Sequence, residues 1–123
     1  MAPDCVGAAY EAVRDRLGGI TLGEFVAATA GFHFEPVHVG GQLVGALVVA
    51  GNELHACIDP AARGRWLSKR VLRVLDAVIR EHGEAVTRAT TEEGRRFVEA
   101  LGFVQDGEIY RSRKTWVWNR LSA

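Results

Sequence analysis

Residues 53–83 read ELHACIDPAARGRWLSKRVLRVLDAVIREHG and contain a strand-like run, a loop led by Pro60 and a helical pattern. The helix is predicted from about Trp66 to His82, and Gly83 ends it. Its apolar side chains recur at helical spacing, at Leu67, Val71, Val74, Leu75 and Val78. A strand followed by a loop and an amphipathic helix favours a domain in which helices cover a sheet.

The segments on either side of this stretch extend the mixed pattern. Before and within it, the expected elements are helices over 4–17 and 21–31 and strands over 32–39, 42–50 and 53–58. After it, we expect a strand over 84–90, a helix over 90–102 with Thr90 and Glu93 in capping-box register, and closing strands over 103–111 and 114–121. This order predicts one mixed α/β domain of the α+β type over residues 1–123.

Composition and charge narrow the class of protein. Fifteen basic and 15 acidic side chains cancel, so no global field draws the chain to nucleic acid or to an anionic membrane. The N-terminus lacks the apolar core of a secretory signal, and the longest apolar run, 43–51, is far shorter than the roughly 20 residues of a membrane span. Cys5 and Cys57 are expected to be free thiols in a reducing compartment. These features predict a cytoplasmic protein with no membrane segment.

A local basic cluster follows Pro60. No acid interrupts the bases before Leu75, which are Arg63, Arg65, Lys69, Arg70 and Arg73. Backbone N–H groups and the dipole at the start of the following helix suit a pyrophosphate, and the bases add positive charge. The alternative is a solvated helix face, and binding of nucleic acid is the weaker interpretation because the chain has no net positive charge.

Residues 53–110 resemble the GNAT superfamily of acetyl-CoA-dependent N-acetyltransferases in three features that follow the order of the family. The segment ELHACIDP resembles the family's central strand, which ends in a proline-led loop. The segment ARGRWLSKRVLRVLDAVIREHG resembles the family's pyrophosphate loop and the helix that follows it. The next helix, the Leu-Gly-Phe signature and the strand after it resemble TTEEGRRFVEALGFVQDGEIYR. The chain also looks like compact GNAT-like proteins of tailed phages and prophages. The resemblance implies a mostly antiparallel central sheet with helices on both faces, although the first strand usual in the family is not evident.

The resemblance implies acetyl-CoA as co-substrate and an amine as acceptor. The loop pattern of the family, Arg/Gln-x-x-Gly-x-Gly/Ala, places Arg63 at its first position, Trp66 at its first glycine and Ser68 at its last small residue. Trp66 either packs on the sheet or stacks on an adenine. The implied cofactor-binding residues are Cys57, Ile58, Arg63, Gly64, Arg65, Trp66, Leu67, Ser68, Lys69 and Thr91.

The catalytic candidates are fewer. The tyrosine that the family often carries three residues before Leu-Gly-Phe is Val98 here, so Tyr110 is the remaining candidate proton donor, unless it only packs. Glu53 and His55 are candidate bases on one face of the strand, and the alternative for His55 is a buried histidine satisfied by a neighbour. Cys57 is better explained as a buried structural thiol than as a nucleophile. No metal site is predicted.

Two functions follow from these residues. The first is an N-acetyltransferase that uses acetyl-CoA on an unidentified amine. The second is a GNAT-fold module whose catalysis has lapsed and that serves in binding or structure, such as a virion-associated phage or prophage protein. Trp116 and Trp118 share one face of the last predicted strand. If this face points outward, it favours a homodimer or a larger assembly through the closing strands, and if it points inward, the two tryptophans belong to the core.

Overall fold

A computed structural model describes residues 2–62, 64–89 and 91–113. Its helices and strands follow in the order α1 (Ala2–Val13), α2 (Leu22–Ala28), β1 (His33–Val39), β2 (Gln42–Ala50), β3 (Glu53–Ile58), α3 (Lys69–His82), β4 (Ala85–Thr87), α4 (Glu92–Ala100), β5 (Val104–Asp106) and β6 (Ile109–Ser112). The strands form a six-stranded sheet in the order β1-β2-β3-β4-β6-β5. Three strand pairs, β1–β2, β4–β6 and β5–β6, are antiparallel, and β3–β4 is parallel. The predicted α+β class with a mostly antiparallel sheet is confirmed.

The chain divides into two compact units. The first contains Met1–Ala50 and His55–Leu67, and the second contains Gly51–Leu54 and Ser68–Ala123. Strand β3 therefore contributes its first two residues to the second unit and its last four to the first.

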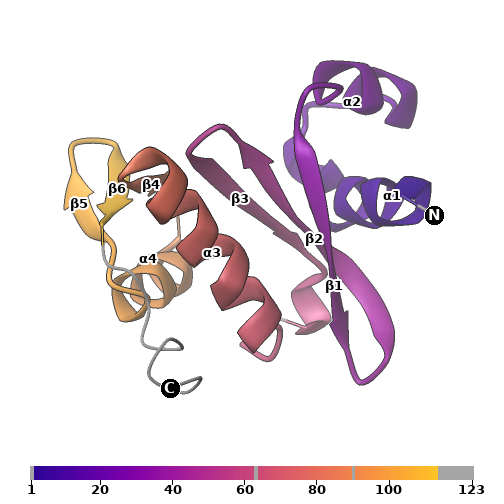
Figure 1. Cartoon of the computed structure of the whole chain (residues 1–123). Coiled ribbons are helices and arrows are strands. Elements are labelled where there is room, and N and C mark those ends of the chain that lie inside the picture. Colours follow the sequence, from indigo (N-terminus) through magenta and orange to yellow (C-terminus); the bar gives the residue numbers. More distant parts are fainter. Residues whose placement is uncertain (1, 63, 90, 114–123) are drawn as a thin grey trace. The chain divides into compact units, whose positions relative to one another are not determined.

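The first unit is built on the β1–β2 hairpin, with α1 packed along it (Figure 1). The hairpin turns at Gly40-Gly41, and both residues have the positive φ that the turn requires. Its core contains the side chains of Cys5, Ala9, Val13, Phe25, Ala46, Val48 and Cys57. The α1 members of this core recur every four residues, which is the spacing that puts them on one helix face. The predicted capping box at the start of α2 is confirmed, with Thr21 and Glu24 exchanging hydrogen bonds of 3.1 and 2.8 Å.

A bulge in β2 lies beside the end of β3. Val37 pairs with Gly45 and His38 with Leu43, so Val44 is the extra residue of β2. The Val44 carbonyl accepts the Asp59 N–H at 2.8 Å. Gly45 has φ +148°, and a Cβ there would lie 2.0 Å from the Cys57 carbonyl oxygen. Only glycine therefore allows β2 to lie this close to β3.

In the second unit, β4 is central. It pairs in parallel with β3 at Glu53↔Val86 and in antiparallel with β6 over three residue pairs. Helix α3 packs on β4 and buries Val71, Leu75, Val78 and Ile79. Its end at the predicted Gly83 is confirmed, because Gly83 is a left-handed C-cap at φ +85°.

The prediction that the long helix starts at Trp66 is wrong by about one turn. Ser68 is extended, at φ −142° and ψ 169°, and its hydroxyl accepts the Val71 N–H at 3.3 Å. Ser68 is therefore the N-cap, and the helix begins at Lys69. Leu67 lies before the helix and is 41% exposed, so it does not belong to the buried stripe.

Two further boundaries differ from the sequence prediction. The N-cap of α4 is Thr91, not Thr90, because the Thr91 hydroxyl accepts the Gly94 N–H at 3.0 Å. Residues 103–111 do not form one strand, because Gly107 takes φ +67° and turns the chain between β5 and β6. The pair Asp106-Gly107 is the sequence signal for this turn. The predicted strand over 114–121, with Trp116 and Trp118, lies outside the described residues.

Replacing Gly45 tests the close approach of β2 to β3. We expect Gly45→Ala to lower the free energy of unfolding by at least about 3 kcal/mol, because the new Cβ overlaps backbone and the positive φ strains any other residue. Gly7→Ala is the control, since Gly7 lies inside α1 with open space around it, and we expect a gain of about 0.5–1 kcal/mol. Urea unfolding of the two variants measures both values, and equal stability would contradict the packing described.

Candidate functional site

The loop after β3 is closed by its own hydrogen bonds. The Asp59 carboxylate accepts the Ala61 N–H at 2.9 Å, and the Asp59 carbonyl accepts the Ala62 N–H at 2.8 Å. The Arg65 guanidinium donates to the Ala61 carbonyl at 2.7 Å. Gly64 takes φ +80°, a left-handed conformation that side-chain-bearing residues rarely adopt. The glycine that the loop pattern retains is therefore needed for the turn itself.

Trp66 is 7% exposed. This burial supports the core-packing interpretation of Trp66 over stacking on an adenine, because a stacking face must be open to the ligand. Arg63, the first residue of the expected phosphate loop, lies outside the described residues. Gly64 and Arg65 are exposed.

The start of α3 combines a cap with a cluster of cations. Ser68, Lys69, Arg70 and Arg73 are all exposed, and the first turn contains no acid. The other capped α-helices begin differently, with Glu24 in the first turn of α2, and Glu92 and Glu93 in that of α4. Cations at a helix N-terminus oppose the dipole, at about 0.3–1 kcal/mol each. An anion bound at this turn would remove that opposition.

Cys57 lies at the end of β3 inside the core of the first unit. Burial raises the pKa of its thiol, and the nearby Arg16 guanidinium acts in the opposite direction with the smaller effect. The thiol is therefore held protonated, which supports a structural thiol and not an activated nucleophile. Ile58 is also buried, at 5% exposure.

The second unit holds Tyr110 and Glu53 on opposite faces of the sheet. Glu53 is in register with Val86, and Val86 with Arg111, whereas Tyr110 is in register with Thr87, one residue along. Residues in register share a face and neighbours along a strand alternate, so Glu53 and Tyr110 point apart. His55 is half-buried two residues beyond Glu53. The structure thus does not bring the candidate base Glu53 and the candidate proton donor Tyr110 together.

Tyr110 is 2% exposed, and its hydroxyl has no hydrogen-bond partner in the described part of the chain. Thr87, directly opposite, donates its hydroxyl to the Leu54 carbonyl at 2.7 Å. Thr91, an expected cofactor residue, uses its hydroxyl as the α4 N-cap, and Val98 is half-buried. The sequence pattern did not indicate Thr87, because its partner is 33 residues away.

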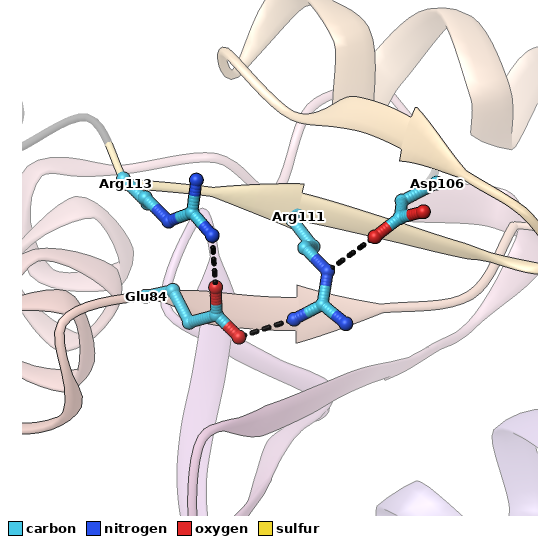
Figure 2. A network of polar contacts seen from close by, with 4 residues as sticks. All are labelled: Glu84, Asp106, Arg111 and Arg113. Carbon is cyan, nitrogen blue, oxygen red and sulfur yellow. Dashed lines mark hydrogen bonds and ion pairs between the residues drawn. The ribbon is translucent and has the colours of Figure 1, made fainter.

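A cluster of charged side chains connects the start of β4 with β5 and β6, on the face of the sheet that carries Arg111 (Figure 2). The Arg111 guanidinium donates to Glu84 and, at 2.7 Å, to Asp106, while Arg113 donates to Glu84 at 3.2 Å. The hydrogen bond to Asp106 and the charge of Glu84 raise the pKa of Arg111. No local sequence pattern indicates this cluster, since Glu84 and Arg111 are 27 residues apart.

Comparison with protein-family models, with curated proteins and with solved structures finds no match for this chain. Among the described residues, no helix is long and apolar enough to cross a membrane. No group of three or more His, Cys, Asp or Glu side chains within the same part of the chain has the geometry to hold a metal ion.

The pH dependence of stability tests the burial of Cys57. A raised pKa means that the folded protein holds this proton more tightly than the unfolded chain does. Its contribution to stability is present below the ordinary thiol pKa of 9.0 and is lost as the pH rises toward the folded-state pKa. We therefore expect wild type to lose more stability than Cys57→Ala between about pH 8 and pH 10.5 in urea unfolding. Parallel losses in the two proteins would show that the thiol is not buried.

Proposed function

We propose that this chain is an acetyl-CoA-dependent N-acetyltransferase that holds the phosphates of the cofactor at the start of α3. The observation that carries the proposal is the charge at this turn. Lys69 and Arg70 lie in the first turn of α3, whereas the first turns of α2 and α4 contain glutamate. Such a helix start is electrostatically unfavourable alone and favourable with a phosphate at its N–H groups. The resemblance of residues 53–110 to the GNAT superfamily supplies the identity of the anion.

In the proposed reaction, the amine nitrogen of the acceptor attacks the thioester carbonyl carbon, the C–S bond breaks, and CoA departs as a thiolate. The thiolate takes a proton, and the amine loses one. Tyr110 is the proposed proton donor to the thiolate, supported by its buried hydroxyl without a partner in the described chain. His55 or Glu53 is the proposed base, acting on the amine directly or through water.

The second candidate is a binding or structural module whose catalysis has lapsed, such as a phage or prophage protein. It is favoured by the placement of Glu53 and Tyr110 on opposite faces, which separates the candidate base from the candidate proton donor. Val98 at the position of the usual tyrosine points the same way. Both candidates include the phosphate site, so binding and turnover are tested separately.

Calorimetric titration of acetyl-CoA tests the phosphate site. We expect micromolar binding by wild type and a loss of at least about tenfold in Lys69→Glu/Arg70→Glu, because charge-assisted hydrogen bonds contribute about 1.5–3 kcal/mol each. The matched control is Arg95→Glu/Arg96→Glu, which makes the same charge change on the exposed face of α4 and should leave binding unaltered. Equal weakening in both variants would assign the effect to net charge, and no binding by wild type would end the proposal.

The variant Tyr110→Phe tests whether the Tyr110 hydroxyl serves catalysis or the stability of the fold. Because the hydroxyl has no partner in the described residues, its removal should leave the melting temperature unchanged or slightly raised. We expect acetyl transfer to fall by about 100-fold while acetyl-CoA binding is kept. The measurement is release of free CoA thiol with a panel of amines, beside the calorimetric titration. Binding without turnover in wild type would favour the lapsed module, and a marked drop in stability would show that the hydroxyl is satisfied.

A further inference from the structure

One guanidinium ties three strands of the second unit together. Arg111 lies on β6 and contacts Glu84, which precedes β4, and Asp106, which ends β5 (Figure 2). Arg113, the residue after the end of β6, binds the second oxygen of the Glu84 carboxylate. Glu84 therefore holds two guanidiniums at once and is the point at which the β5–β6 hairpin is fixed to the start of β4.

Among the described residues, the outer part of this hairpin makes one further ion pair, of 4.0 Å, between Glu108 and Arg88. All three residues of β5 are exposed, and Val104 is exposed to 70%. Strand β6 pairs with β4 over three residue pairs only. The ion pairs are partly exposed, with side-chain exposures of 62% for Asp106, 34% for Arg111 and 19% for Glu84. Partly exposed pairs of this kind are weakened by salt.

The same strand carries a buried face. Because side chains alternate along β6, Arg111 points to one side and Tyr110 and Ser112 point to the other. Tyr110 and Ser112 are each 2% exposed. A side chain buried to this degree meets a solute only after the structure around it opens locally. The ion pairs on one face of β6 thus oppose the motion that would uncover the other face.

We propose that Glu84, Asp106, Arg111 and Arg113 form a salt-sensitive latch that keeps the β5–β6 hairpin on β4, and that release of this latch uncovers Tyr110 by opening the hairpin as a unit. The latch is a local device and does not depend on the proposed acetyl transfer. It predicts that opening of the hairpin depends on ionic strength, whereas the β1–β2 hairpin of the first unit stays closed.

Nitration of tyrosine by tetranitromethane, followed by peptide mass spectrometry, measures the uncovering of Tyr110. The chain has two tyrosines, and Tyr10, whose hydroxyl donates to the Ile20 carbonyl at 2.6 Å, is the internal reference. We expect Tyr110 nitration in wild type to rise about fivefold from low salt to about 1 M NaCl. In Glu84→Gln it should be about fivefold faster at low salt and should gain little from added salt.

The matched control is Glu108→Gln, the same chemical change on the same hairpin at a glutamate that is 93% exposed and 4.0 Å from Arg88. It should nitrate like wild type. Asp106→Asn removes the other contact of Arg111 and should resemble Glu84→Gln, which keeps the test valid if one variant folds poorly. Salt-independent nitration in wild type, or equal rates in the Glu84 and Glu108 variants, would overturn the latch. A parallel rise at Tyr10 would show opening of the whole protein and would overturn it as well.

Discussion

The close contact between Gly45 and the Cys57 carbonyl constrains the first unit more than any other interaction described. It brings β2 and β3 to a separation that no side chain fits, and the bulge at Val44 supplies the carbonyl that binds Asp59. Asp59 then closes the loop with two hydrogen bonds to Ala61 and Ala62. The path of the chain from the end of β3 into its basic loop therefore depends on a glycine 14 residues earlier than Asp59 in the sequence.

The basic loop and the start of α3 show a conflict between local stability and charge. Helices α2 and α4 place glutamates in the first turn, as the helix dipole favours, and α3 places Lys69 and Arg70 there. Ser68 still caps the helix, so the turn forms in spite of its charge. A sequence that breaks a local rule at one helix and obeys it at two others points to a requirement at that helix beyond folding.

Strand β6 combines two opposite environments. Its Arg111 face carries a network of ion pairs in contact with solvent, and its Tyr110 face is buried. Because side chains alternate along a strand, both environments fit within the four residues of β6. The side chains of the exposed network lie on the opposite face of β6 from Tyr110, so they can be substituted without changing a residue of the buried face.

The amino-acid sequence by itself determined the elements whose signals are local. Turns, caps and periodicity depend on neighbours within a few residues, so four features were predictable. These are the hairpin turn at Gly40-Gly41, the capping box of Thr21 and Glu24, the strands of the β1–β3 region and the helix end at Gly83. The start of α3 was misplaced because the apolar Leu67 continues the helical period, and the hydroxyl of Ser68 decides the boundary. The pair Asp106-Gly107 is a local signal for the turn at Gly107, and the prediction of one strand over 103–111 overlooked it.

Only the tertiary structure decided how the candidate site residues are placed. Strand register, and which strands are neighbours, decide three features of the structure. These are the burial of Cys57 and Trp66, the opposite faces of Glu53 and Tyr110, and the cluster around Glu84. These contacts join residues that are far apart in the chain, so no local pattern encodes them. The sequence supplied the charges and hydroxyl groups, and the pairing of β4 with β3 and β6 decided which of them share a face, because a shift of one residue in register reverses every side chain of a strand.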